Sequence, residues 1–359
     1  MDITVLLLLA ASGALLIPLL AGDDDDDRDD GEIRGTFEDD EIEGTEGDDV
    51  ILGFLGNDTI NAGAGQDAVI GGEGNDVING GDNRDILEGR AGNDTINGDD
   101  GNDTILGGAG DDMLDGGYGS DIMRGGRGDD LIYGGFDARL IDGELVNAVD
   151  RTDTLRGEGG EDTIYIWGGG GFAAGGVDDN DNDIADEKDT LVLVTGTATL
   201  SDDAGSTDFY ALANIEDDVE TFAIIDEFDN GNPLDADDRG EHRLILTVDI
   251  DLGDSDVVPQ VGFEAATGSI EENGETVNGI FISAKLLNPE DFPDSEFEEA
   301  AAFFRGETNP TQEDLQTFIE NNYQIEVVYT DAADNDYFMP QNTVAAIAAQ
   351  VGPHPNLLS

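Results

Sequence analysis

A nine-residue pattern of apolar and polar positions runs from Gly35 to Tyr133 without an insertion or a deletion. Position eight of each nonapeptide is aliphatic or Met, from Ile42 to Ile132. Because successive side chains of a strand point to opposite faces, positions seven to nine predict a short strand with residue eight directed inward. One repeat cannot bury its single aliphatic residue alone. The pattern therefore predicts a stacked solenoid in which two repeats form one coil.

Glycine and aspartate mark the turns between these strands. From Gly44 the copies are GTEGDDVIL, GFLGNDTIN, AGAGQDAVI, GGEGNDVIN, GGDNRDILE, GRAGNDTIN, GDDGNDTIL, GGAGDDMLD, GGYGSDIMR and GGRGDDLIY, preceded by a weaker copy, GTFEDDEIE. Glycine at positions one, two and four permits positive φ, so that main-chain carbonyls can surround an ion. Aspartate at position six supplies the hard oxygen that calcium prefers. Such turns repel one another without metal, which predicts that calcium binding and folding are coupled.

These residues resemble the RTX, or hemolysin-type, calcium-binding repeat with the consensus G-G-x-G-x-D-x-U-x. The resemblance implies a parallel β-roll in which each ion lies between stacked turns, held by the position-six aspartate and main-chain carbonyls. About eight Ca²⁺ ions are expected in the roll. The implied side-chain ligands are Asp49, Asp58, Asp67, Asp76, Asp85, Asp94, Asp103, Asp112, Asp121 and Asp130.

Three turns depart from the consensus. Asn83 replaces the glycine at position four and is followed by Arg84, which predicts a strained or vacant turn before Asp85. Ala62 replaces a first glycine, which is a milder change, and Glu38 at position four weakens the expectation for the first turn.

Beyond Tyr133 the period breaks and then resumes. Arg139 to Val146 predicts a β-hairpin with Asp142 and Gly143 at its turn. The sequence Asp153-Thr-Leu-Arg fits the end of a repeat, and Gly157 to Tyr165 is a full copy that adds Asp162 to the expected ligands.

An acidic segment, DDNDNDIADEKD at 178–189, resembles the calcium loops of thrombospondin type 3 and dockerin repeats. Its matching acids are Asp179, Asp181, Asp183 and Asp186, although the glycine that usually follows the third Asp is missing. We expect calcium here, with an acidic linker as the alternative. Lys188-Asp-Thr-Leu-Val fits the end of a repeat, so the segment can also cap the roll.

The fold class predicted is all-β dominated: a parallel β-roll followed by a β-rich C-terminal domain with two or three short helices. The expected parts are an apolar segment at 1–22, an acidic linker at 23–34, a roll at 35–193 with insertions near 136–149 and 166–184, and the C-terminal domain at 194–359. Its expected elements are strands at 221–225, 244–250 and 325–329, a hairpin at Asn273-Gly274, and helices at 295–304, 312–321 and 343–351.

The charge balance narrows the partners. The chain has 85 acidic and 14 basic residues and a formal net charge of -71, which repels nucleic acid and anionic surfaces and attracts cations. A solubilising surface for salty surroundings is the alternative to metal binding. The chain has no cysteine and two histidines, which disfavours zinc, haem and copper sites.

Residues 3–21 are apolar and are followed at once by Asp23 to Asp27. An export signal and a retained membrane anchor are equally compatible with this segment, and both place the acidic chain outside the cytoplasm. The RTX resemblance implies type I secretion through a C-terminal signal, a route that needs no apolar leader. We therefore expect a secreted or cell-surface protein and leave the export route open.

The sequence does not indicate an enzyme. It has no H-E-x-x-H, no G-x-S-x-G and no cysteine nucleophile. His242, His354 and Trp167 stand in surface or packing contexts. The first function expected is that of a calcium-stabilised extracellular structural or surface protein. The alternative makes the roll a secretion and folding aid for a C-terminal domain that binds a glycan or another partner, or, with lower expectation, is catalytic.

Overall fold

The computed structural model of the chain describes residues 32–135, 138–141, 144–147, 152–167, 171–176, 189–195, 197–202, 209–212, 222–227, 243–250, 260–272, 275–287, 289, 297–299, 301–305 and 324–331. The chain divides into two compact units, Met1–Glu32 and Ile33–Ser359, and the fold below is that of the second. Its named elements are all strands. Among the described residues, no helix has the length and apolarity needed to cross a membrane.

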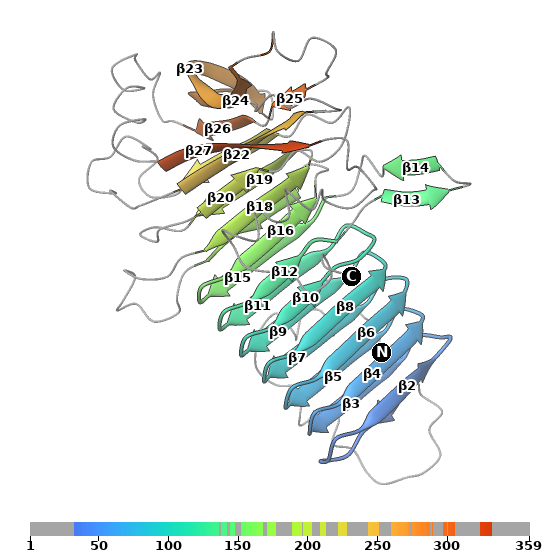
Figure 1. Cartoon of the computed structure of the whole chain (residues 1–359). Coiled ribbons are helices and arrows are strands. Elements are labelled where there is room, and N and C mark those ends of the chain that lie inside the picture. Colours follow the sequence, from blue (N-terminus) through green and yellow to red (C-terminus); the bar gives the residue numbers. More distant parts are fainter. Residues whose placement is uncertain are drawn as a thin grey trace. The chain divides into compact units, whose positions relative to one another are not determined.

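Two sheets contain nearly all the strands (Figure 1). Sheet A has, in spatial order, β1 (Glu32–Arg34), β3 (Val50–Leu55), β5 (Ala68–Glu73), β7 (Ile86–Ala91), β9 (Thr104–Ala109), β11 (Ile122–Arg127), β15 (Thr154–Gly159), β17 (Gly171–Ala174), β19 (Thr197–Asp202), β21 (Phe222–Glu227), β26 (Ala301–Arg305), β24 (Glu275–Leu286) and β23 (Val261–Glu272).

Sheet B has β2 (Glu41–Thr45), β4 (Thr59–Ala64), β6 (Val77–Asp82), β8 (Thr95–Asp100), β10 (Met113–Asp115), β12 (Leu131–Tyr133), β16 (Thr163–Trp167), β18 (Thr190–Thr195), β20 (Phe209–Leu212), β22 (Arg243–Ile250) and β25 (Phe297–Glu299). Strand β27 (Gln324–Asp331) also pairs with β22, and β13 (Ala138–Ile141) pairs with β14 (Glu144–Asn147) as a separate hairpin.

Consecutive repeats alternate between the two sheets, so two repeats make one coil. Strand β3 pairs in parallel with β5, with Ile51 opposite Val69, and β4 pairs with β6, with Ile60 opposite Ile78. Each pair is 18 residues apart, which is twice the nonapeptide. The predicted parallel roll and its register are therefore confirmed.

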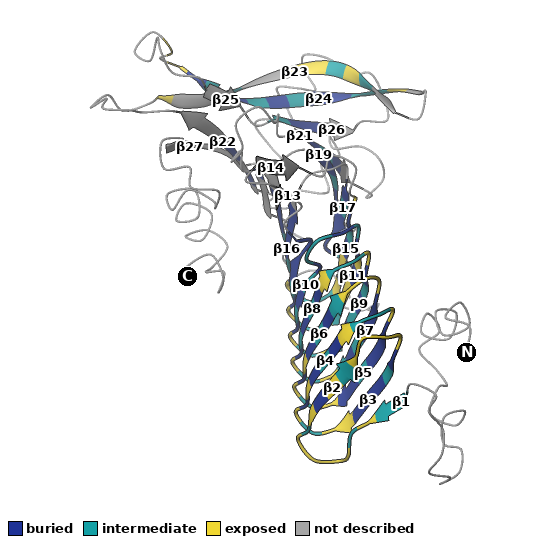
Figure 2. Cartoon of the chain, turned by 90° about the vertical axis from the view of Figure 1, so that its right-hand side faces the viewer, coloured by how far each residue is buried: buried dark blue, intermediate teal, exposed yellow. Residues whose placement is uncertain are grey.

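The core of the repeat region is a single row of residues from each sheet. The position-eight side chains from Ile51 to Ile132 are all 0–1% exposed. In Figure 2 the interior of the stacked strands is correspondingly dark blue, whereas the turns carry most of the exposed residues. Position eight thus faces inward, as the alternation predicts.

The turn backbone explains the glycine pattern. Positions two and four have positive φ in most copies, for example Gly72 at 131° and Gly74 at 132°. Asn83 adopts the same conformation at 83°, which asparagine tolerates better than most residues. The turn before Asp85 therefore keeps the shape of its neighbours, at the cost of a non-glycine residue in a left-handed conformation.

The coils continue beyond the repeats. Strands β15 and β16 resume the two sheets, and β17 adds a further strand inside the range expected to be an insertion, 166–184. Strands β18 to β22 then extend both sheets in parallel through residues 193 and 194, without a break in strand order at the expected domain boundary.

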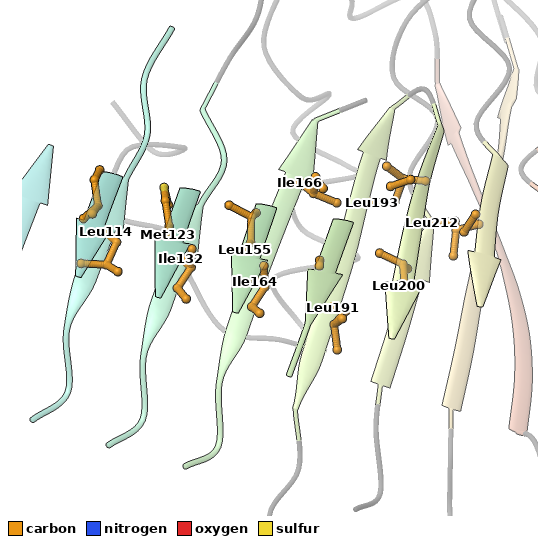
Figure 3. Packing of buried hydrophobic residues seen from close by; sticks show 14 of the residues in the cluster. Leu114, Met123, Ile132, Leu155, Ile164, Ile166, Leu191, Leu193, Leu200 and Leu212 are labelled. Atoms are coloured by element: carbon orange, nitrogen blue, oxygen red, sulfur yellow. The ribbon is translucent and has the colours of Figure 1, made fainter. Parts of the chain in front are cut away.

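A second inward position becomes apolar in these later coils. In the repeats, position one is nearly always glycine, whereas in β16 and β18 it is Ile166 and Leu193, both 0% exposed. Figure 3 shows Ile166 beside Ile164 and Leu193 beside Leu191, each pair on one strand. The later strands β16, β18, β19, β21, β22 and β24 each contribute two or more buried apolar residues to the shared core.

Several expected C-terminal elements are confirmed. Strands β21, β22 and β27 cover the three expected strands, and β23 pairs with β24 from Glu272 opposite Glu275, as a hairpin at Asn273-Gly274 requires. Strand pairing likewise confirms the hairpin at 139–146, with Ile141 opposite Glu144.

The helix expected at 295–304 is wrong. Its residues form β25 and β26, and β26 pairs with β21 on one side and β24 on the other. Phe303 is fully buried, with its ring 4.7 Å from that of Phe281. Pairing on both sides and aromatic burial override the local helix propensity of the alanine and glutamate residues. The expected helices at 312–321 and 343–351 lie outside the described residues.

Candidate metal centre

The position-six aspartates form two rows, one at each edge of the stacked sheets. At the AB edge, where the chain passes from sheet A to sheet B, the row is Asp40, Asp58, Asp76, Asp94, Asp112, Asp130, Asp162 and Asp189. At the BA edge, where it returns to sheet A, the row is Asp49, Asp67, Asp85, Asp103, Asp121 and Asp153. Apart from Asp40, which is partly buried, these side chains are at most 4% exposed.

Each row is joined by hydrogen bonds that run from one coil to the next. The backbone N–H of each aspartate donates to Oδ1 of the aspartate in the next coil, at 2.7–3.0 Å. The spacing is 18 residues within the repeats, 32 from Asp121 to Asp153 and 27 from Asp162 to Asp189. One carboxylate oxygen of each inner aspartate is thus fixed by the main chain.

The other oxygen, Oδ2, is buried without a donor in most of the row. Among the described residues, no hydrogen-bond donor reaches Oδ2 of Asp58, Asp67, Asp76, Asp85, Asp94, Asp103, Asp112, Asp130 and Asp162. A buried, unpaired carboxylate oxygen is costly, and a bound cation removes that cost. The rows therefore fit a cation at each turn.

At most position-one glycines, the open carboxylate oxygen and a main-chain oxygen both approach the α-carbon. A methyl group on Gly98, at position one, would lie 2.6 Å from Asp103 Oδ2 and 2.6 Å from the carbonyl oxygen of Gly116 in the next coil. A methyl group on Gly80 would meet Asp85 Oδ2 and the Gly98 carbonyl in the same way. Glycine is therefore favoured at position one, because these two oxygens crowd its α-carbon, although Ala62 occupies this position in the turn before Asp67.

This donor set suits calcium. In the described part of the chain, no group of three acidic, histidine or cysteine side chains is placed to hold a metal ion. An ion at a turn must therefore combine one carboxylate oxygen with main-chain carbonyls. Calcium accepts six to eight such hard oxygens with flexible geometry, which matches a site made largely of backbone.

Burial alters the acidity of the rows. Desolvation raises the pKa of Asp85, Asp103 and Asp112 to about 7, that of Asp130 to about 8 and that of Asp162 to about 9. The backbone N–H of the preceding coil opposes this shift, and neighbouring carboxylates add to it. Without metal, the folded roll therefore favours protonated aspartates close to neutral pH.

A second row of side chains, at position five, joins the turns in the opposite direction. At the AB edge it runs without interruption, because the N–H of Asn57, Asn75, Asn93, Asp111, Asp129 and Glu161 each donates to the side chain one coil earlier. At the BA edge the N–H of Gln66 donates to the side chain of Asp48, and the N–H of Ser120 donates to the side chain of Asn102. Arg84 occupies position five between these two segments, and its side chain has no oxygen that could accept such a bond.

The BA row ends where glycine takes the place of the position-six aspartate. The next position six after Asp153 is Gly171, and the position one before it is Ile166. A methyl group on Gly171 would lie 2.7 Å from Ile166 Cδ1. In the repeats, a small residue at position one accompanies a carboxylate at position six. In this turn the large side chain is at position one and the glycine is at position six. An aliphatic side chain therefore fills the space of the carboxylate.

The structure places the ten expected ligands from Asp49 to Asp130, and Asp162, in the two rows. It adds Asp153 and Asp189, whose Asp-Thr-Leu sequences were the available signal. It also shows that Asp40 joins the AB row. Asp179, Asp181, Asp183 and Asp186 lie outside the described residues, as do His242 and His354.

Two parallel sheets wound from nonapeptides, with an aspartate row along each turn edge, define a β-roll. Residues 34–69, 70–105, 79–114, 106–141 and 148–171 match the RTX calcium-binding nonapeptide repeat. This part of the chain therefore consists of hemolysin-type RTX repeats, which bind Ca²⁺. No curated protein matches the chain.

Proposed function

We propose that this chain is an extracellular calcium-binding protein whose repeat region folds when calcium binds and serves a structural or cell-surface role. The observation that carries the proposal is the double row of buried aspartates with open Oδ2 atoms. Ionised carboxylates stacked at the roughly 4.8 Å spacing of neighbouring strands repel one another, so the roll needs cations at neutral pH. Calcium is millimolar outside cells, which suits the weak, backbone-rich sites of such turns.

A secreted location agrees with the RTX repeats, since proteins of this class are typically secreted. The apolar residues 3–21 are compatible with an export signal or a membrane anchor. A further calcium site in the acidic segment at 178–189 remains part of the proposal. Its place in the sequence supports it, because the segment ends at Asp189, which belongs to the AB row.

A second role is supported by the continuity of the sheets. Strand β18 pairs with the repeat strand β16, and β19 to β22 continue the two sheets and share the same core. A roll that folds on calcium would give these strands an edge on which to pair, so the repeats would act as a folding aid for the C-terminal part. That part would then carry recognition of a glycan or a protein partner, and we propose no catalytic activity for the chain.

Calcium titration of the full-length chain tests the proposal. We expect far-ultraviolet circular dichroism to show a large gain of β-structure as calcium replaces chelator, and native mass spectrometry to show about eight or more bound ions. Magnesium at the same concentration is the control, because its demand for octahedral geometry and retained water suits these turns poorly. A full chain that is equally structured in chelator would contradict coupled folding.

A further inference from the structure

The first turn of each edge differs from all the later ones. Position two is threonine in the first two copies, Thr36 and Thr45, and these precede Asp40 and Asp49. In the later repeats, position two has a positive φ even where it is not glycine, as at Phe54 and Arg90. Neither Thr36 nor Thr45 has a positive φ. A β-branched residue strongly disfavours that conformation, so threonine changes the direction of the turn backbone.

The changed backbone directs two donors at one carboxylate oxygen. The N–H of Thr45 donates to Asp49 Oδ2 at 2.7 Å, and its Oγ1 hydroxyl donates to the same atom at 2.8 Å. Thr36 does the same for Asp40 Oδ2, at 2.6 and 2.9 Å. Each threonine hydroxyl also accepts a hydrogen bond from the backbone two residues on, at Gly47 and Glu38 respectively.

These bonds satisfy the oxygen that is open in the later turns. Oδ2 of Asp58 and Asp67, one coil further along each edge, has no donor among the described residues. A solenoid needs capping at its ends, because the last coil has no neighbour to complete its turns. On the basis of calcium binding by the later turns, we propose that Thr36 and Thr45 are metal-free caps. Asp40 and Asp49 then bind no calcium, and each row of ions begins one coil later.

This inference separates Asp49 from the ligands implied by the repeat pattern alone. Position six is aspartate in both kinds of turn, so the consensus treats them alike. The identity of position two decides whether Oδ2 receives hydrogen bonds or stays open. The sequence Gly-Thr-x-x-x-Asp is thus the mark of a closed turn in this chain, and Gly-Gly-x-Gly-x-Asp the mark of an open one.

A matched pair of variants of the full-length chain tests the caps by native mass spectrometry in calcium. Asp49→Asn should leave the number of bound ions unchanged, because the amide oxygen of the new side chain still accepts the bonds from Thr45. Asp67→Asn, at the same edge, should lower the number by at least one. Loss of an ion in both variants would overturn the caps, whereas absence of calcium from the wild-type chain would instead overturn calcium binding itself.

Opening the cap gives a second, independent measurement. Thr45→Gly permits the positive φ found at Gly63 and Gly72, so we expect one more bound ion than in the wild-type chain. Thr45→Ser keeps the hydroxyl and should leave the count unchanged. Hydrogen exchange should show faster exchange at Gly47 in the glycine variant. No added ion in Thr45→Gly would contradict a turn closed by threonine.

Discussion

The repeats and the later coils use one architecture with two kinds of interior. From β3 to β12 each strand contributes one aliphatic or Met residue at position eight to the central core, and the second inward position is almost always glycine beneath a carboxylate. In β16 and β18 that second position is Ile166 and Leu193, and at Gly171 the carboxylate is gone. Burying one such side chain contributes about 1.5–3 kcal/mol, so β16 and β18 roughly double their apolar stabilisation relative to a repeat strand. Calcium and apolar packing are thus alternative ways to complete a coil.

Removal of calcium should separate the two regions most strongly. In chelator, backbone amides of β3 to β11 should exchange with solvent at least about 10³-fold faster, because the aspartate rows repel one another. Amides of β18, β22 and β24 should change by less than about tenfold, since their interior is apolar. Hydrogen exchange with mass spectrometry measures both regions in one sample. Equal acceleration in the two regions would refute the contrast.

Acid should replace calcium in part. The pKa of the row aspartates is raised in the metal-free fold, so the folded state binds more protons than the unfolded chain does. Stability without calcium is then present at low pH and is lost as pH rises through about 6 to 9. We expect circular dichroism in chelator to show more repeat structure at about pH 5 than at about pH 8. The same pH change in saturating calcium serves as the control.

Truncation of a core side chain should have different consequences in the repeats and in the later coils. Leu114→Ala and Leu193→Ala each remove a fully buried side chain and should cost about 2–5 kcal/mol. Leu114→Ala should also weaken apparent calcium affinity, because folding of the repeats and ion binding are coupled. Leu193→Ala should lower the free energy of unfolding in chelator as well as in calcium. Denaturant titrations in both conditions distinguish these outcomes.

Neutralising one row aspartate should change the stability of the roll in opposite directions with and without calcium. Asp103→Asn removes one buried charge, so it should stabilise the roll in chelator and destabilise it in calcium, each by about 1–3 kcal/mol. Asp82→Asn, at an exposed position three, is the matched control and should have little effect in either condition. The same direction of change in both conditions would mean that Asp103 does not contact the ion.

The smallest effect is expected at the irregular turn. Asn83→Gly relieves a left-handed non-glycine residue and should raise stability by less than about 1 kcal/mol. Thermal unfolding in calcium measures this change. A loss of stability would show that the Asn83 side chain supports its turn.

The repeat region could be predicted almost completely because every level agrees there: position eight is buried, position six forms the rows, and the register is 18 residues. The fold was harder to predict in the later coils, where apolar packing replaces the glycine and aspartate turns. Asp153 and Asp189 each follow an insertion, and only the short sequence Asp-Thr-Leu marks them as part of a repeat. The strands after β18 do not follow the nonapeptide period, so no periodic signal in the sequence indicated that they belong to the same two sheets.

One error of a different kind came from tertiary context. The helix expected at 295–304 failed because Phe303 and its neighbours are paired on both sides, which local propensity does not register. The hydrogen bonds from Thr36 and Thr45 to Asp40 and Asp49 could not be predicted, because the consensus describes only which residues are typical at each position. It does not report which oxygen of a carboxylate already has a donor.

The hydrogen bonds of the aspartate rows join adjacent coils, however many residues separate the two aspartates in the sequence. A bond that spans 18 residues in the repeats spans 32 across the first insertion and 27 across the second, at the same length within 0.3 Å. Both insertions enter between position two and position six, where the chain already leaves the sheets. The edges of the roll are therefore sites at which new loops can be gained during evolution while strand pairing is preserved. A protein built this way can change what it displays without changing how it folds.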